Sequence, residues 1–357
     1  MRDIGEPAVV IIGKPTVYTE KLAELILANG YEVLTIDIAL EEVTDFLQKQ
    51  KNVQLLILDI AYTKKDASMI KKIKKLSSIP IIILSSRSVH DTAQTVYAIA
   101  DGANDFIICE RLTETSYLQD IEKKILHALD SKSLIKPSRK KQKKKAYREV
   151  KKKHSPKKRP KKSQDFTHIV AIGTSTGGPN ALQTVLKNIP KDFPAPIVIV
   201  QHMPAGFTRS LAKRLDEICE IHVKEATNNE SLQAGTAYIA PGENHMEITD
   251  DCRIRIYHDD VNVGHQPSVN VLFESIARLH HLEKVAVILT GMGKDGSKGI
   301  RKLKEADDDT VVIVESEETA VIFGMPRAAI RTGHVTEVSR LEDVSEIIVH
   351  YVMERGI

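Results

Sequence analysis

The stretch THIVAIGTSTGGPNAL, residues 167–182, determines how the second half of the chain folds. Its first six residues form an apolar run typical of a buried strand, and the residues after Gly178 begin a helical pattern. Between the two lies the turn Gly173–Gly178, whose three glycines allow the chain to reverse sharply. A strand that leads through a tight turn into a helix is the repeating unit of a parallel α/β sheet.

The same alternation continues to the end of the chain. Strands are predicted at 167–172, 195–201, 237–240, 253–258, 285–290 and 310–314, and helices near 178–188, 206–218, 268–280, 296–306 and 341–354. We therefore predict a doubly wound, mostly parallel α/β domain with a small antiparallel insertion around 237–258.

The first 131 residues show a second series of the same kind. Strand-like runs lie near 8–12, 32–36, 53–58, 79–84 and 104–108, and helix-like stretches near 16–29, 40–49, 66–76, 90–101 and 115–129. Five such βα units predict a flavodoxin-like (βα)5 domain, an α/β fold with a parallel sheet covered on both faces.

A strongly basic segment separates the two series. Residues 136–162 contain 16 Lys or Arg, three Pro and one acid, Glu149, so the rest of the chain is net acidic although the whole chain carries +3. Because so few apolar side chains cannot offset the entropy of ordering, we expect a disordered linker that like charges keep extended. The predicted division is a domain at 1–131, a linker at 132–165 and a domain at 166–357.

The composition, 42% apolar and 28% charged, is that of a soluble globular protein. No apolar run reaches the roughly 18 residues of a membrane helix, and no signal-peptide pattern precedes the first strand. The cysteines (Cys109, Cys219 and Cys252) are scattered and lack metal-ligand spacing. We expect a cytoplasmic protein that is not transmembrane, with no metal site and no cofactor.

Ser175 is the first candidate for chemistry. Together with its neighbours Gly173 and Gly177 it matches the nucleophile elbow G-x-S-x-G on a strand-to-helix turn. The N-terminus of the following helix offers unpaired N–H groups that favour an oxyanion. The motif alone leaves a second interpretation open, because glycine-rich turns after a first strand more often cradle a phosphate or nucleotide.

Two other strand ends carry the partners that a nucleophilic serine needs. His202 follows the run IVIVQ, and Asp295 lies in a glycine-rich turn after VAVILT. Because the carboxyl ends of parallel strands meet at one edge of a sheet, the three side chains should converge. His202 would then remove the proton of Ser175, and Asp295 would fix the imidazole tautomer and stabilise the imidazolium. The order Ser…His…Asp differs from that of the α/β-hydrolases and indicates a convergent triad.

Simpler interpretations remain for each residue. His202 could be a capping residue, Asp295 could be only the N-cap of the next helix, and His245 and His265 also lie in predicted loops. The alternative function is a non-catalytic nucleotide-binding or scaffold protein of a two-component-type signalling system. That alternative lacks a GK[ST] sequence after the first glycine turn and an acid-bearing second strand.

The second domain resembles the catalytic domain of the chemotaxis protein-glutamate methylesterase (CheB) family. The resemblance runs in order through IGTSTGGPNAL, VIVQHMPAGFTRSLAKRL, AYIAPGENHME, HQPSVNVLF, VILTGMGKDGSKG and FGMPRAAI. It implies hydrolysis of glutamate methyl esters on cytoplasmic helices of methyl-accepting chemoreceptors, with release of methanol, in chemotaxis adaptation. Members of this family also deamidate particular receptor glutamines.

The resemblance assigns roles to residues of this chain. It implies that Ser175, His202 and Asp295 are nucleophile, base and acid, and that the backbone N–H groups of Thr176 and Met292 form the oxyanion hole. Two positions differ from the family: Asn270 stands where Asp is usual, and Asp307–Asp309 replace a glycine-containing turn. Neither is expected to touch the triad, so we expect activity to be retained.

The first domain is similar to the phospho-acceptor receiver that restrains the esterase in this family. Asp59 stands at the acceptor position and Ser85 at the hydroxyl position. However, Gly13–Lys14 replace the acidic pair that binds Mg²⁺ in receivers, and Cys109 or Glu110 falls where a lysine belongs. We therefore predict a pseudo-receiver, kept for contacts or for control without phosphate. The opposing hypothesis is that Asp59 is still a slow phospho-acceptor.

The partners of the chain are expected to follow from these parts. The receiver-like domain could contact a histidine kinase. The basic segment could bind nucleic acid or anionic lipid, contact acidic surfaces of receptors or of its own domains, or act only as a spacer. Tyr147 is the single aromatic residue within it, so stacking on bases is not expected.

Overall fold

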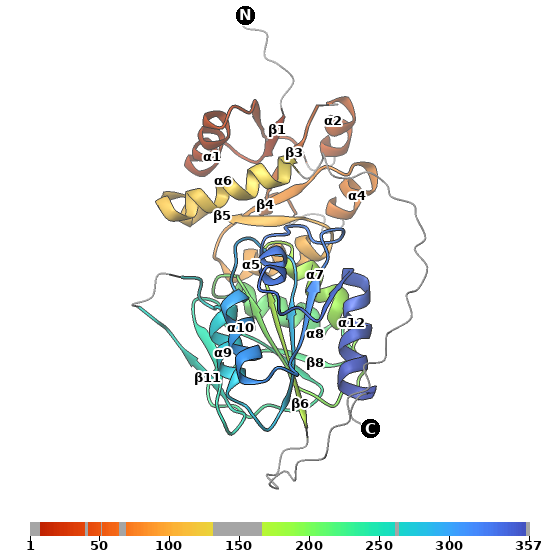
Figure 1. Ribbon diagram of the computed structural model, residues 1–357. Helices are drawn as coiled ribbons and strands as arrows, with labels where there is room; N and C mark the ends of the chain where they lie inside the picture. The colour runs from red at the N-terminus through yellow and green to blue at the C-terminus, as the bar shows by residue number, and fades with distance from the viewer. Residues whose placement is uncertain are drawn as a thin grey trace, which may run out of the picture.

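The computed structural model describes residues 8–39, 42–50, 52–63, 69–130, 166–260 and 264–354. The predicted linker at 132–165, with its basic segment, lies outside these residues. The described chain forms two α/β domains that lie against each other, the first drawn in red to yellow and the second in green to blue (Figure 1).

The first domain contains a parallel sheet with the strand order β2-β1-β3-β4-β5, which confirms the flavodoxin-like prediction. Its strands are β1 (Val9–Ile12), β2 (Val33–Ile36), β3 (Leu55–Asp59), β4 (Ile81–Ser85) and β5 (Asp105–Ile108). Its helices are α1 (Val17–Ala28), α2 (Val43–Lys49), α3 (Ile60–Thr63), α4 (Met69–Leu76), α5 (Val89–Ala100) and α6 (Thr115–Asp130), with a 3₁₀ turn at Cys109–Thr113. Because both faces of β1, β3 and β4 are covered, these strands read as unbroken apolar runs.

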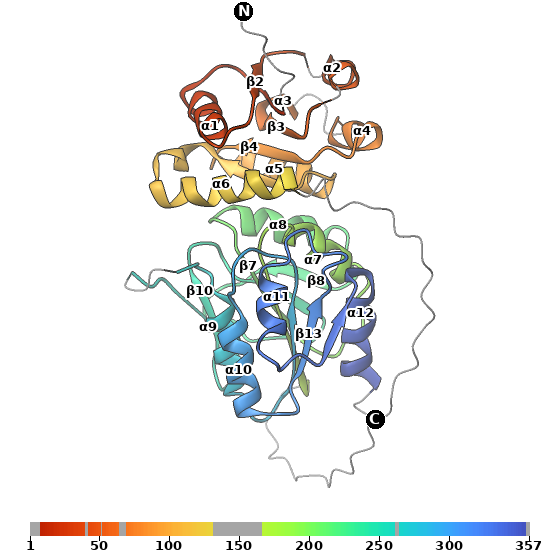
Figure 2. The same ribbon diagram turned by 45° about the horizontal axis from the view of Figure 1, so that its top comes forward.

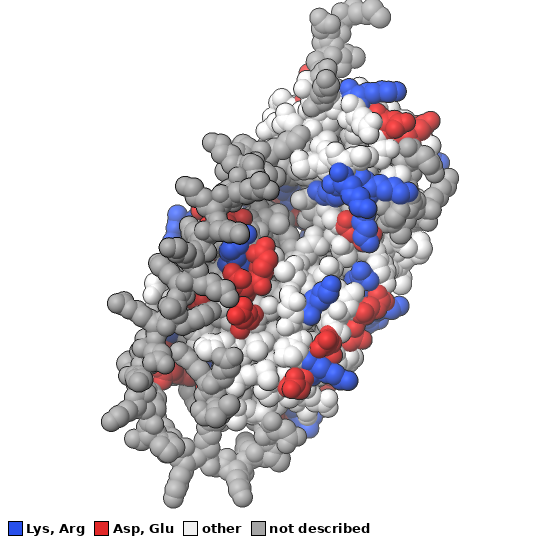
Figure 3. Space-filling view, turned by 90° about the vertical axis from the view of Figure 1, so that its right-hand side faces the viewer, with Lys and Arg blue, Asp and Glu red and all other residues white. Residues whose placement is uncertain are grey.

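Helix α4 shows how the sequence builds the surface of this domain. In MIKKIKKL, residues 69–76, the side chains of Met69, Ile70 and Ile73 are buried against the sheet. The intervening Lys71 and Lys72 are exposed. Figure 3 shows basic side chains gathered on the upper part of one face of the molecule. The helical period therefore places one apolar face on the core and one charged face in water.

The second domain contains a fully parallel seven-stranded sheet with the order β14-β13-β12-β6-β7-β9-β8. Its strands are β6 (His168–Thr174), β7 (Ile197–Gln201), β8 (His222–Glu225), β9 (Thr236–Ile239), β12 (Glu283–Ile288), β13 (Val311–Glu315) and β14 (Glu337–Ser339). A separate antiparallel pair consists of β10 (His245–Ile248) and β11 (Ile254–Tyr257). The predicted doubly wound, mostly parallel fold with a small antiparallel insertion is confirmed.

The predicted composition of that insertion is wrong in one respect. Residues 237–240 belong largely to β9, which pairs in parallel with β7 and β8 inside the main sheet. Strand β10, which completes the antiparallel pair instead, was not predicted. Alternation of apolar residues reports that a strand is half-buried, but it carries no information about the direction of the neighbouring strand.

The helices of the second domain cover both faces of its sheet. They are α7 (Gly178–Leu186), α8 (Phe207–Asp216), α9 (Val269–Ala277), α10 (Ser297–Ala306), α11 (Met325–Ile330) and α12 (Leu341–Val349), which continues through His350–Glu354. Side chains of α7, α8 and α12 pack on one face with Val170 and Ile172. Side chains of α9, α10 and α11 pack on the other face with Ile169 and Ala171. The central strand β6 is therefore wholly buried, as its sequence predicted.

The two domains share an apolar contact. Helix α5 of the first domain lies over α7 and α8 of the second, as both ribbon views show (Figures 1 and 2). The ring of Phe106 stacks on that of Phe207 with centroids 4.6 Å apart, and Tyr97 Oη lies 3.1 Å from the Glu217 carboxylate. The Asn180 amide donates to the Ala103 carbonyl at 3.3 Å. These contacts place the β5 side of the first domain over the second domain.

The acidic run that replaces a glycine-containing turn has a structural partner. Asp307 lies 3.1 Å from the ammonium group of Lys284, whose side chain is fully buried. A buried cation without a counter-charge is strongly destabilising, so Asp307 compensates Lys284.

Every helix in the described parts of the chain is too short or too polar to cross a lipid bilayer.

Candidate active site

Three predicted residues converge at the carboxyl ends of neighbouring strands. Strand β6 lies between β12 and β7, and the direction of the chain across the sheet reverses there. Ser175 follows β6, His202 follows β7, and Asp295 lies in the loop after β12. His202 Nε2 lies 2.9 Å from Asp295 Oδ2. The predicted convergence at a switch point of the sheet is therefore observed for the histidine and the acid.

The carboxylate of Asp295 is held from several sides. It accepts hydrogen bonds from the backbone N–H groups of Val269 at 2.7 Å and Asn270 at 3.0 Å, and from the hydroxyl of Ser268 at 3.0 Å. Burial raises the pKa of this carboxyl, but the hydrogen bond and charge of His202 and the two backbone donors outweigh it and hold the pKa well below its ordinary value. Asp295 is therefore ionised wherever His202 can act as a base.

The geometry distinguishes the two nitrogens of His202. Because an ionised carboxylate only accepts hydrogen bonds, Nε2 must carry the hydrogen that faces Asp295. Nδ1 is buried and has no hydrogen-bond partner among the described residues. The nitrogen that is available as a base is therefore Nδ1. The ring is also stacked on His265, with centroids 4.4 Å apart, and burial followed by the proximity of His202 lowers the pKa of His265.

Ser175 lines the same cavity as His202 and is half-buried. Its hydroxyl forms no hydrogen bond with His202 within the described residues. Such bonds are often long in resting enzymes and shorten when substrate binds, so the arrangement is compatible with a nucleophile and its base.

The turn around Ser175 requires small residues. Gly177 has φ +81°, in the left-handed region that favours glycine, and a Cβ there would lie 2.8 Å from Val321. A Cβ on Gly178 would lie 2.0 Å from the side-chain oxygen of Gln201. The glycines that suggested a tight turn are therefore needed for close packing behind the serine.

Gln201 is a site residue that sequence reasoning missed. Its side-chain amide donates to the Ser175 carbonyl at 2.9 Å and to the His202 carbonyl at 3.3 Å, so it joins the backbones of the two residues. The signal available in the sequence was a polar residue at the end of an otherwise apolar strand. In the structure this residue is almost fully buried, so its amide needs hydrogen-bond partners.

Several backbone N–H groups that line the cavity are available for an oxyanion. Those of Thr176 and Met292 make no hydrogen bond to any described residue, and both residues line the cavity beside Ser175. By contrast, the N–H of Ser175 is occupied, because it donates to the Thr290 carbonyl at 3.0 Å. This arrangement supports the pair that the resemblance suggested.

The expectation that Asn270 lies clear of the triad is wrong. Its backbone N–H donates to Asp295, and its side-chain oxygen accepts from the N–H groups of Gly296 and Gly299 at 3.0 and 2.9 Å. Asn270 therefore caps α10 and ties the start of that helix to the loop that carries Asp295. A neutral amide fills this role without adding a second negative charge beside Asp295.

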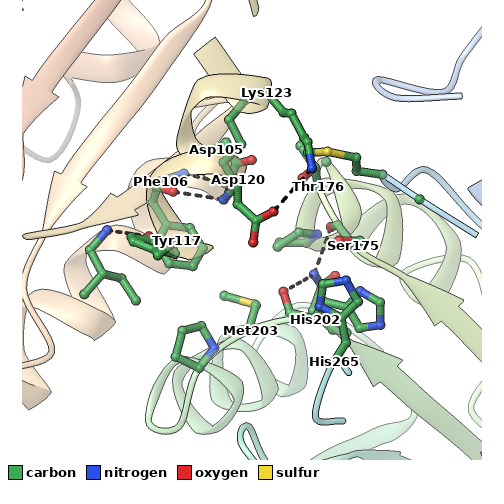
Figure 4. A pocket seen from close by; sticks show the side chains of 18 of the residues that line it. Asp105, Phe106, Tyr117, Asp120, Lys123, Ser175, Thr176, His202, Met203 and His265 are labelled. Carbon is green, nitrogen blue, oxygen red and sulfur yellow. Dashed lines mark hydrogen bonds and ion pairs between the residues drawn. The ribbon is translucent and has the colours of Figure 1, made fainter. Parts of the chain in front are cut away.

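The cavity in front of Ser175 has a volume of about 270 Å³ and walls from both domains. Figure 4 shows Ser175, Thr176, His202 and His265 on one side of it. The opposite side is formed by first-domain residues, among them Asp105, Phe106, Tyr117, Asp120 and Lys123. His245, the other loop histidine considered above, instead lies buried in β10 against Tyr257.

The described residues of the first domain form no site that fits Mg²⁺. Asp59 ends β3, and one of its oxygens accepts the N–H of Ala61 at 2.9 Å. Gly13 and Lys14 follow β1 at this corner, and the described residues contain no cluster of three or more acids, histidines or cysteines placed to hold a metal. Cys109 lies close enough that Asp59 contributes, after burial, to raising the pKa of its thiol to about 12. Among the described residues, Asp59 and a neutral thiol do not match the several oxygen ligands that Mg²⁺ requires.

Ser85, at the predicted hydroxyl position, is fully buried. It donates to the Ser86 carbonyl at 3.1 Å and accepts from the Thr95 hydroxyl at 2.7 Å. Its hydroxyl is therefore engaged by its own loop and by α5.

The chain is similar to known proteins over most of its length. The CheB methylesterase family matches residues 170–348. The chain is 41% identical over 320 residues to the protein-glutamate methylesterase/protein-glutamine glutaminase of Halalkalibacterium halodurans, covering 85% of this chain and 87% of that protein. It is 36% identical over 350 residues to the protein of the same name from Oceanobacillus iheyensis, covering 95% and 97%.

Two solved structures are similar to separate halves of the chain. The CheB methylesterase catalytic domain of Thermotoga maritima is 43% identical with a TM-score of 0.49, and covers 52% of this chain and 99% of that chain. A response regulator receiver domain protein from Clostridium thermocellum is 22% identical with a TM-score of 0.30, covering 36% and 98%.

Replacing Asp295 by Asn should suppress the reactivity of Ser175. The amide can donate to Nε2, which favours the tautomer with a hydrogen on Nδ1 and leaves no base for the serine. We expect the rate at which a fluorophosphonate labels Ser175 to fall by about 10³- to 10⁴-fold while the fold is retained. Intact mass spectrometry over time measures this rate, and an unchanged rate in Asp295→Asn would show that Asp295 is not part of a triad.

Proposed function

The chain belongs to the CheB methylesterase family, and we propose that Ser175, His202 and Asp295 are the residues with which it acts as a protein-glutamate methylesterase and protein-glutamine glutaminase. The observation that carries the assignment of residues is the buried His202–Asp295 pair at the strand ends beside Ser175. The function serves chemotaxis, and family membership replaces the alternative of a non-catalytic nucleotide-binding protein. The substrate helices are those of chemoreceptors, and the place of action is the cytoplasm.

The first half of the reaction forms an acyl-enzyme. Ser175 Oγ attacks the carbonyl carbon of the glutamate ester while its proton passes to His202 Nδ1. The charge that develops on the carbonyl oxygen is stabilised by the N–H groups of Thr176 and Met292, and the imidazolium by Asp295. When the C–O bond to the methoxy group breaks, His202 returns the proton and methanol leaves.

The second half releases the glutamate. Water takes the place of methanol, gives a proton to His202 Nδ1 and attacks the acyl carbon, and the bond to Ser175 Oγ then breaks as the serine regains its proton. Deamidation of a glutamine follows the same steps, with ammonia as the first leaving group. Because an amine leaves only when protonated, that reaction depends more strongly on the imidazolium.

The first domain restricts access to Ser175. An α-helix is about 10 Å wide with its side chains, whereas the cavity between the domains holds about 270 Å³. A receptor helix therefore reaches Ser175 only after the first domain has moved away. The Phe106–Phe207 stack and the ion pair between Arg87 and Glu243 oppose that movement.

The first domain acts as a pseudo-receiver. The absence of an acidic cluster at Asp59 in the described residues, together with Lys14 after β1, supports control by contacts rather than by phosphate. A histidine kinase contact through this domain, and contacts of the basic segment with acidic surfaces, are further expected partners.

The substrate assignment is tested with methylated receptor membranes. We expect the full chain to release methanol and Ser175→Ala to release it at least about 10³-fold more slowly, because the alanine removes the nucleophile. Gas chromatography measures the methanol. Equal rates for the two proteins would refute the assignment of Ser175.

Loosening the domain contact should increase activity. Phe106→Ala removes a stacked aromatic pair worth about 0.5–1.5 kcal/mol beyond its buried area, so methanol release should rise by about two- to tenfold. Phe46→Ala, the same change on α2, which packs in the core of the first domain, is the matched control and should leave the rate unchanged. If both variants or neither are activated, the contact at Phe106 is not a restraint.

The opposing hypothesis for Asp59 is tested by direct phosphorylation. We expect no phosphoryl adduct after incubation with acetyl phosphate and Mg²⁺, because the donor set at this corner does not fit the metal. Intact mass decides the question: a stoichiometric adduct that disappears in Asp59→Asn would overturn the pseudo-receiver proposal.

A further inference from the structure

Glu315 is a buried carboxyl group that the mechanism above does not use. It ends β13, next to β12, and is fully buried. Its Oε2 accepts the backbone N–H of Thr290 at 2.7 Å. In the sequence it is the acid that closes the otherwise apolar strand VVIVE. A buried acid needs a specific reason, because taking a carboxylate out of water is costly.

Thr290 connects Glu315 directly to the catalytic turn. Its carbonyl accepts from the Ser175 N–H at 3.0 Å and from the Thr174 hydroxyl at 2.8 Å. Its own hydroxyl donates to the Thr176 carbonyl at 2.9 Å. One residue thus lies between Glu315 and the nucleophile turn, and the peptide that Glu315 holds lies two residues before Met292 in the oxyanion loop.

The surroundings of Glu315 favour its neutral form. Burial raises the pKa of Glu315 to about 7, against the lowering effect of the Thr290 N–H and the Thr319 side chain. Glu342 of α12 raises it further, and Glu342 itself faces Arg340 at 3.5 Å. In the described part of the chain no Lys or Arg contributes to stabilising the carboxylate. Asp295, which His202 and several donors hold ionised, is the opposite case.

We propose that Glu315 is a positioning residue of the esterase reaction that supports the Ser175 turn and the oxyanion loop best as a neutral acid. The proposal rests on the function proposed above. The transition state places a negative charge between the N–H groups of Thr176 and Met292. Glu315 holds the N–H of Thr290, and the oxyanion donor Met292 lies two residues further along the chain. With about 3.8 Å between consecutive Cα atoms, the Glu315 carboxyl lies on the order of 10 Å from that charge. At this distance a second negative charge slows the step by on the order of tenfold in a protein interior.

The pH profile of the full chain tests this proposal. We expect the rate of methanol release by the wild type to fall by about tenfold at alkaline pH, as Glu315 ionises. Glu315→Gln keeps the acceptor for the Thr290 N–H and cannot ionise, so its rate should stay high at alkaline pH and equal the wild-type rate at acid pH. Glu337→Gln, which removes another partly buried acid from the neighbouring strand β14, is the matched control and should keep the alkaline fall.

Binding of an alkylboronic acid separates this proposal from the choice of substrate. A boronic acid forms an anionic tetrahedral adduct on an activated serine, whatever ester the enzyme hydrolyses. Above the pKa of Glu315, the boronic acid should bind the wild type about tenfold more weakly than it binds Glu315→Gln. The reason is that the Glu315 carboxylate and the anionic adduct repel each other, and this coupling is reciprocal. Two outcomes overturn the proposal. In the first, the rate and the affinity decline at alkaline pH in both the wild type and Glu315→Gln. In the second, Glu315→Gln loses rate and affinity equally at every pH.

Discussion

The hydrogen bond between His202 and Asp295 is the interaction on which the rest of the site depends. It exists because the loops after β7 and β12 meet beside the central strand β6. Asp295 can stay ionised in a buried place because three backbone N–H groups and a hydroxyl also donate to it. The same bond decides which imidazole nitrogen is left for Ser175. A substitution in the loop that carries Asp295 can therefore alter the tautomer of His202 without contacting its ring.

The sheet holds the residues on both sides of this hydrogen bond in fixed positions. Both faces of the sheet are covered, so β6, β7 and β12 are fixed by packing as well as by their parallel ladders. Polar residues at the strand ends then connect the loops. Gln201 joins the backbones of Ser175 and His202, and Thr290 joins the Ser175 turn to β12 and, through Glu315, to β13. Their side chains form hydrogen bonds with backbone C=O and N–H groups that have no partner in the strand ladders.

The sequence predicted the two folds and the meeting of Ser175, His202 and Asp295 at one edge of the sheet because both follow from strong local signals. Unbroken apolar runs mark strands that are buried on both faces, and residues just after such strands must meet at one edge of a sheet. Strands β8, β10 and β14 were missed because they are short, and in β8 and β14 the apolar pattern is weak. The contact of Asn270 with Asp295 and the role of Gln201 depend on tertiary distances that no spacing reports. The choice between Nδ1 and Nε2 likewise needs the position of Asp295.

The central claim is that Asp295 holds the hydrogen on His202 Nε2 and leaves Nδ1 as the base for Ser175. Nitrogen-15 chemical shifts of the histidine-labelled full chain test it most directly, recorded well above the usual histidine pKa of about 6.5. Comparison with His202→Gln assigns the two signals. The account predicts a protonated Nε2 and an unprotonated Nδ1 for His202. A protonated Nδ1 under these conditions would contradict it.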